Sequence, residues 1–83
     1  MTHAVVWEQH AMDEFRRLRI VDPVGAKATT AAVRALADDP RPEEAGALGA
    51  SGYYRLHIGT WRVLYRPDGT TVIIHVLKVG RST

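Results

Sequence analysis

The chain has 83 residues, of which 46% are hydrophobic and 24% are charged, and its formal net charge is +2. This composition is typical of one small globular domain and argues against a disordered protein, so we assign residues 1–83 to a single domain. The absence of cysteine excludes disulfides and thiolate metal sites and favours a reducing, cytoplasmic location. No apolar run approaches the roughly 20 residues that span a bilayer, so we expect neither a membrane segment nor a secretory signal.

The charges are distributed unevenly along the chain. From Tyr53 onwards there are five Lys or Arg residues and a single acid, Asp68, whereas the other eight acids precede Tyr53. This asymmetry predicts a positive surface on the C-terminal part of the domain and an anionic partner. The four histidines fall in separate predicted elements, and no phosphate-binding or dinucleotide-binding motif is present, so we expect no metal site and no cofactor.

The N-terminal half predicts a short strand followed by a helix. Residues 3–7 alternate weakly between polar and apolar side chains and form the candidate strand. Residues 8–20 then place Ala11, Phe15 and Leu18 at the spacing of one helix face. We expect an amphipathic helix of about three turns here, with its arginines on the outer faces.

A second helix is predicted to begin at Asp22 and Pro23, since aspartate is a favoured N-cap and proline a favoured first helical residue. We expect it to extend to Ala37 and to pack on the first helix. Residues 39–52 are rich in proline and glycine and predict a long loop, anchored to the core by Leu48. The apolar stripe of the second helix is expected to consist of Ala28, Ala31, Ala32, Ala35 and Leu36, with Val33 at its edge.

The most informative stretch is YYRLHIGTWRVLYR, residues 53–66. Its two alternating runs are separated by Gly59-Thr60, which predicts a β-hairpin closed by a two-residue turn. That turn would pair Ile58 with Trp61 and would divide the side chains between two faces, because they alternate along each strand. The core face would hold Tyr54, Leu56, Ile58, Trp61, Val63 and Tyr65; the opposite face would hold Tyr53, Arg55, His57, Arg62, Leu64 and Arg66.

After the hairpin, residues 67–70 read Pro-Asp-Gly-Thr and predict a turn in which proline presets φ and glycine takes a positive φ. Residues 71–79 are apolar on both faces and predict a central strand, in which His75 is expected to be a packed histidine. The fold class is therefore α+β. We expect a small antiparallel sheet with an N-terminal helical hairpin packed on one face, in the order β-α-α-β-β-β.

The charged face of the hairpin is the candidate site. Opposite and diagonal neighbours on two strands lie about 5–8 Å apart, which suits several phosphates of a nucleic-acid backbone better than one small ligand. Arginine binds phosphate in a bidentate manner, tyrosine can stack on a base, and imidazole can transfer protons near neutrality. A solvated sheet surface is the alternative. The grouping of Arg55, His57, Arg62 and Arg66 beside Tyr53 favours an anion site.

Several stretches together resemble the RelE/ParE superfamily of toxins from bacterial type II toxin–antitoxin systems. They are the strand ending at Trp7, the AVRAL-DDP segment, and YYRLHIGTWRVLYR followed by IIHVLKVGR. The usual family form, YRLRVGDYRVLY followed by a strand and VGHR, is matched by residues 54–65 and by Val79-Gly80. The resemblance implies the fold derived above and an antitoxin partner, whose apolar and acidic segment would cover the basic face.

RelE-like members of this superfamily are ribosome-dependent endoribonucleases that cleave mRNA without a metal, by activating a ribose 2′-OH against the adjacent phosphate. On this resemblance Arg62 is expected to stabilise the scissile phosphate, while Arg55 and Arg81 neutralise flanking charge. His57 is the candidate acid/base. The expected RNA-binding residues are Tyr53, Arg66 and Lys78.

The chain also departs from the RelE-like pattern. Ser82 stands where the family commonly has arginine, and no tyrosine or histidine follows it among the 83 residues. Either His57 or a terminal basic group therefore replaces the usual proton-transfer residue, or the protein does not cleave RNA. The alternatives are a ParE-like toxin that inhibits DNA gyrase without nuclease activity, and a degenerate toxin that only binds its antitoxin.

Overall fold

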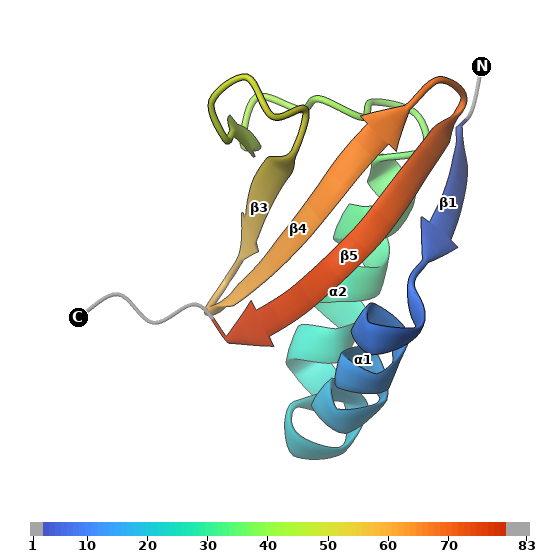
Figure 1. Cartoon of the computed structure of the whole chain (residues 1–83). Helices are drawn as coiled ribbons and strands as arrows, with labels where there is room; N and C mark the ends of the chain where they lie inside the picture. Colours follow the sequence, from blue (N-terminus) through green and yellow to red (C-terminus); the bar gives the residue numbers. More distant parts are fainter. Residues whose placement is uncertain (1–2, 80–83) are drawn as a thin grey trace.

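A computed structural model describes residues 3–79 and consists of two helices packed on one face of a five-stranded sheet (Figure 1). The α+β class and the helical hairpin on one face are as predicted. The elements are β1 (Ala4–Trp7), α1 (Gln9–Val21), α2 (Pro23–Ala35), β2 (Gly46–Ala47), β3 (Tyr54–Ile58), β4 (Trp61–Asp68) and β5 (Thr71–Val79).

The strand order is β1-β5-β4-β3-β2, and β1 runs parallel to β5. The sheet is therefore mixed: the antiparallel arrangement predicted from the sequence holds for β2 to β5, and β1 joins as one parallel strand. The helical hairpin explains this direction, because it returns the chain to the end of the sheet where β1 starts. There the backbone N–H of His3 donates to the carbonyl oxygen of Ala37 over 2.6 Å.

The register of the β3–β4 hairpin is the one predicted from its turn. Ile58 pairs with Trp61, His57 with Arg62, and the pairing continues to Tyr54 and Tyr65. Gly59 has a φ of 61°, the positive value that a two-residue hairpin turn beginning with glycine requires. The next turn differs from the prediction. Pro67 still belongs to β4 and pairs with Val72, so the turn is reduced to residues 69 and 70.

The face of α2 that packs on the sheet is not the predicted alanine stripe. Ala28, Ala31 and Ala35 are exposed and Ala32 is half-buried, whereas the buried positions of this segment are Ala26, Thr29, Val33 and Leu36. The prediction favoured the alanines because they are apolar. The burial of Thr29 rotates the contact face away from them, and a buried threonine leaves no apolar signal in the sequence. The segment 39–52, predicted to be a loop, also differs from the prediction, because it contains the short strand β2. Leu48, the predicted anchor of this segment, is half-buried.

The core lies between the helices and the sheet and is dominated by Leu18, Leu36, Val63, Tyr65, Ile74 and Leu77. Tyr65 is fully buried, and its hydroxyl donates to the carbonyl oxygen of Pro40 over 2.8 Å, which ties the long loop to the core. Burial, together with nearby Tyr54 and Asp39, raises the pKa of this hydroxyl to about 12, so it remains a donor at neutral pH. Neither α1 nor α2 is long and apolar enough to cross a bilayer.

One carboxylate connects the two hairpins. Asp22 caps α2 by accepting from the backbone N–H of Gly25 at 3.0 Å, and its second oxygen accepts from the indole N–H of Trp61 at 3.0 Å. The Trp61 and Gly25 hydrogen bonds lower the pKa of Asp22. A Cβ atom at residue 25 would overlap this carboxylate and lie 3.0 Å from the indole nitrogen. Glycine is therefore required here for close approach.

We expect Gly25→Ala to lower the free energy of unfolding by about 1–3 kcal/mol, because the added methyl group must displace the Asp22 carboxylate from both of its donors. Gly46→Ala is the matched control, since a Cβ at residue 46 meets nothing within 4 Å. Urea unfolding of both variants measures the difference. Equal stability of the two variants would show that the Asp22 contact tolerates displacement.

Asp22→Asn should destabilise the protein in a pH-dependent manner. Because the folded pKa of Asp22 is below its ordinary value of 3.8, the ionised carboxylate stabilises the fold above that value and this contribution is lost as the pH falls through the folded pKa. The stability difference between wild type and Asp22→Asn should therefore be constant near neutrality and shrink in acid. Urea midpoints measured over a pH series test this; a difference that grows on acidification would contradict it.

Thr29→Val should stabilise the protein by about 1–2 kcal/mol, because the Thr29 hydroxyl is fully buried and has no hydrogen-bonding partner among the described residues. Thr30→Val is the control. The hydroxyl of Thr30 donates to the carbonyl oxygen of Ala26 over 3.0 Å, so its removal should bring no such gain. Thermal and urea unfolding measure the stability of both variants. A Thr30→Val variant more stable than Thr29→Val would contradict the prediction.

Candidate functional site

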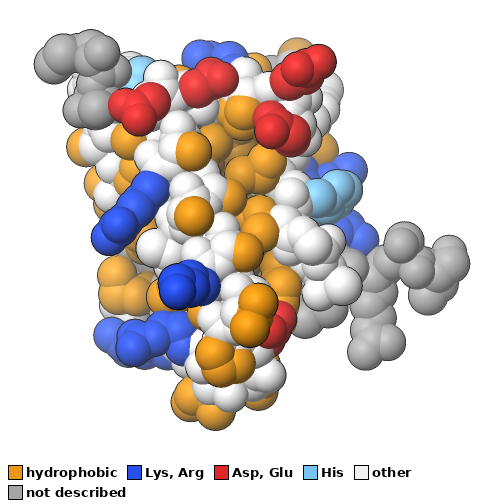
Figure 2. All heavy atoms as spheres, turned by 180° about the vertical axis from the view of Figure 1, so that it is seen from behind, with side chains coloured by type: hydrophobic (Ala, Val, Ile, Leu, Met, Phe, Trp, Pro, Cys, Tyr) orange, Lys and Arg blue, Asp and Glu red, His pale blue; other side chains and the backbone are white. Residues whose placement is uncertain are grey.

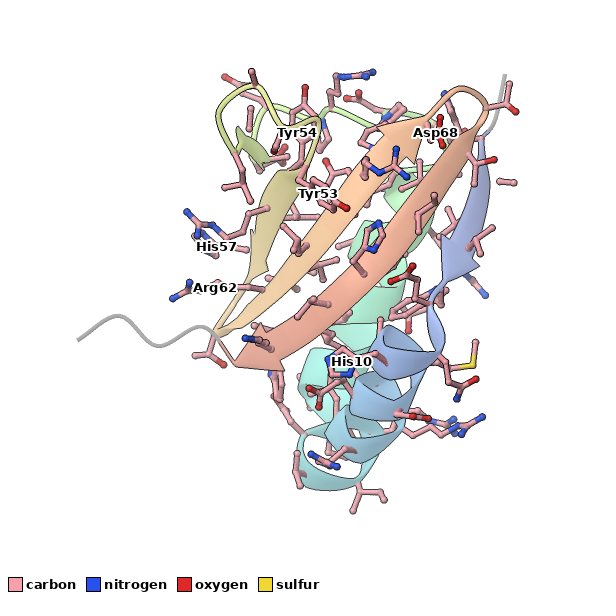
Figure 3. All side chains as sticks on the ribbon, in the orientation of Figure 1. His10, Tyr53, Tyr54, His57, Arg62 and Asp68 are labelled. Atoms are coloured by element: carbon pink, nitrogen blue, oxygen red, sulfur yellow. The ribbon has the colours of Figure 1, made fainter. Side chains whose placement is uncertain are left out.

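The face of the sheet opposite the helices carries the predicted site, and we call it the open face. It is turned towards the viewer in Figures 1 and 3, with α1 and α2 behind the sheet. The hairpin side chains divide as predicted: Leu56, Val63 and Tyr65 are buried on the helix side, whereas Arg55 and His57 are exposed. The open face therefore displays the basic side chains of β3, β4 and β5.

Three neighbouring strands each place a basic or titratable side chain at one level of the open face. His57 on β3 pairs with Arg62 on β4, and Arg62 pairs with Lys78 on β5. We call these three residues the cationic row. Adjacent strands are about 4.8 Å apart, so the row extends across about 10 Å. His57 and Lys78 are exposed and Arg62 is half-buried; Figure 3 shows His57 and Arg62 projecting in the same direction from neighbouring strands.

Arg55 lies two residues before His57 on β3 and therefore projects to the same face. Its cross-strand partner is Leu64, and Leu64 in turn pairs with Val76, so an apolar level separates Arg55 from further cations on β4 and β5. The predicted residue Arg81 lies outside the described residues. The open face thus brings together Arg55 and the cationic row near the β3–β4 turn.

A second group of side chains lies further along the open face. The rings of Tyr53 and His75 have centroids 5.1 Å apart, and the Arg66 guanidinium lies 5.8 Å from the centroid of the Tyr53 ring. The Nδ1 atom of His75 is 2.7 Å from a carboxylate oxygen of Glu8, which follows β1. We call Glu8, Tyr53, Arg66 and His75 the stacked group. Arg66 also forms an ion pair with Asp68 at 3.6 Å.

His75 is a packed histidine, as expected, with 16% of its side chain exposed, but its neighbours were not predicted. Because a carboxylate only accepts hydrogen bonds, Nδ1 carries the proton and donates to Glu8. The other ring nitrogen, Nε2, is buried without a hydrogen-bonding partner among the described residues. The pairing of β4 with β5 shifts by one residue here, from Leu64–Val76 to Tyr65–Ile74, and passes over His75. No residue pattern signals such a bulge.

The helix face of the domain has a different charge distribution. Figure 2 shows acidic side chains gathered at one end of this face and Lys and Arg side chains along one side. Arg16 and Arg17 on α1 form ion pairs with Asp13 and Glu14 at 3.4 and 3.7 Å, as expected for a solvated helix surface. No group of three or more His, Asp or Glu side chains within residues 3–79 converges as metal ligands would.

The arrangement of helices and strands is similar to that of solved RelE-like toxins. The chain superimposes on the RelE–RelB complex from the archaeon Pyrococcus horikoshii with a TM-score of 0.84, at 22% identity over 99% of this chain and 100% of that one. The RelBE2 toxin–antitoxin complex from Mycobacterium tuberculosis gives 0.78, at 24% identity over 95% and 99%. The YoeB dimer from Staphylococcus aureus gives 0.81, at 16% identity over 98% and 100%.

At these identities the solved structures establish the fold alone. The family comes from the sequence: residues 5–83 match the family model of the ParE toxin of type II toxin–antitoxin systems, parDE. The chain therefore belongs to this toxin family, and the predicted membership of the RelE/ParE superfamily is confirmed. No curated protein matches the chain by sequence.

Proposed function

We propose that this toxin is a ribosome-dependent endoribonuclease that cleaves mRNA without a metal ion. The cationic row carries the proposal, because three strands present His57, Arg62 and Lys78 side by side on the open face. Such spacing suits consecutive oxygens of an RNA backbone. The row lies on an open surface, so a second surface must hold the strand against it, and the ribosome would supply that surface in the cytoplasm.

In the proposed reaction the ribose 2′-OH attacks the adjacent phosphorus and the 5′-oxygen of the next nucleotide leaves. Negative charge accumulates on the phosphate oxygens in the transition state, where Arg62 at the centre of the row stabilises it. Lys78 and Arg55 neutralise the flanking phosphates, and Arg81 has the same proposed role. His57 is the proposed acid/base and accepts the proton of the 2′-OH, while the leaving 5′-oxygen, on the opposite side of the phosphorus, takes a proton from water.

We further propose that an antitoxin neutralises this toxin by covering the open face. Two of the similar structures are complexes of a toxin with its antitoxin. Arg55, His57 and Lys78 are exposed in the isolated domain, so an acidic segment can pair with them. An apolar part of the same segment would add buried area beside the charged contacts.

A ParE-like inhibitor of DNA gyrase is the second candidate function. The observation that favours it is the family model, which describes a ParE toxin and matches residues 5–83. In that case the basic side chains would bind gyrase or its DNA and no proton transfer by His57 would be needed. A toxin that only binds its antitoxin would show neither activity.

Arg62→Ala should lower the rate of mRNA cleavage by about 10²–10³, because it removes the group that opposes charge at the scissile phosphate. A translation extract programmed with a defined mRNA measures cleavage by mapping the new 5′ ends. Arg19→Gln is the control: Arg19 is an exposed arginine of α1, on the opposite side of the sheet, and its removal should leave the rate unchanged.

Translation that stops without new mRNA ends would overturn the nuclease proposal. A supercoiling assay with purified DNA gyrase then separates the two remaining candidates. Inhibition by wild type establishes the ParE-like function. If neither mRNA nor gyrase is affected and expression of the chain does not slow growth, the protein only binds its antitoxin.

A further inference from the structure

We propose that the stacked group is a nucleotide-binding subsite for single-stranded RNA, separate from the cationic row. The inference rests on the proposed function, since it assumes that the open face binds RNA. Tyr53 would receive a base and Arg66 a phosphate. Glu8 and His75 would act as positioning residues, because they hold Tyr53 and are not themselves expected to touch the reacting atoms.

The ring of Tyr53 is half-buried and is held at a fixed place on the open face. His75 packs against it with a centroid separation of 5.1 Å and an interplanar angle of 54°. Glu8 in turn fixes the orientation of the imidazole through the 2.7 Å hydrogen bond to Nδ1. A ring that is immobilised before binding loses little freedom when a base stacks on it, which favours affinity.

Arg66 gives the same site a phosphate ligand. Its guanidinium lies 5.8 Å from the Tyr53 ring centroid and 3.6 Å from the Asp68 carboxylate. The Asp68 side chain is 60% exposed, so this ion pair is weak and readily exchanged. A phosphate presents two oxygens to the planar guanidinium and is the stronger partner. Binding of RNA would therefore transfer Arg66 from Asp68 to the phosphate next to the stacked base.

The position of Tyr53, immediately before β3, defines how the RNA would run. Tyr53 precedes His57 by four residues, which corresponds to about 13 Å along an extended strand. One nucleotide cannot contact both places, so the strand must follow the direction of β3 and β4. A dinucleotide is too short to contact both places at once, whereas a longer strand would occupy the cationic row and the subsite together.

The test compares a fluorescein-labelled RNA decamer, followed by fluorescence anisotropy, with an unlabelled dinucleotide, followed by NMR chemical shifts. The full chain is used free of antitoxin. Tyr53→Ala should weaken decamer binding about tenfold, the size of one lost base stack, and leave the dinucleotide-induced shifts of His57, Arg62 and Lys78 unchanged. Tyr53→Phe keeps the ring and should restore binding. Arg19→Gln is the control for loss of a distant positive charge.

Glu8→Ala tests the positioning role. It leaves every proposed RNA-contacting residue in place, yet decamer affinity should fall severalfold because the imidazole and the Tyr53 ring are no longer held. His75→Phe keeps an aromatic ring against Tyr53 without needing Glu8. The double variant Glu8→Ala/His75→Phe should therefore bind the decamer better than Glu8→Ala alone. Circular dichroism confirms that each variant is folded.

The outcomes separate the subsite from the proposed function. If wild type binds no RNA and cleaves no mRNA, the subsite and the proposed endoribonuclease function are both overturned. If wild type cleaves mRNA but Tyr53→Ala and Glu8→Ala bind the decamer as wild type does, the subsite alone is wrong. Loss of the dinucleotide-induced shifts of the cationic row in Tyr53→Ala would also overturn the subsite, because it would show general damage to the open face.

Discussion

The pairing of β3 with β4 is the constraint on which the rest of the molecule depends. Side chains alternate along each strand, so a shift by one residue would exchange the two faces and bring Arg55 and Arg62 into the core. The turn at Gly59 prevents that shift, since only two residues connect the strands. The same pairing that buries Val63 against the helices therefore aligns the basic side chains on the open face. One strand register therefore determines both the core on one face of the sheet and the candidate site on the other.

A single carboxylate, that of Asp22, connects the helices to this hairpin. Asp22 begins α2 and at the same time accepts from Trp61, the first residue of β4. The junction between the helices is thus attached to the turn end of the hairpin, close to the level of the cationic row. Gly25 permits the approach, and an alanine there would separate the two hairpins. A helix cap and a contact to the sheet thus share one carboxylate.

Most of the hairpin, the cap of α2 and the placement of the helices could be predicted, because each depends on local rules of turn length, periodicity and capping. The parts that could not be predicted depend on distant contacts. Glu8 and His75 meet only because β1 lies beside β5, and they are separated by 67 residues. Thr29 is buried although its side chain is polar, which moved the buried face of α2 away from the expected alanines. The pairing of His57 with Arg62 in the cationic row could be predicted from the register of one hairpin. The stacked group could be predicted only from the order of all the strands in the sheet.

The central position of β5 has a consequence for how the toxin comes into being. β5 is the last strand of the described chain, and it lies between β1, the first strand, and β4. Until residues 71–79 are available, β1 has no neighbour to pair with and Arg62 has no Lys78 beside it. Long-range pairing of this kind is formed late in folding. A chain without residues 71–79 therefore has neither a complete sheet nor a complete cationic row.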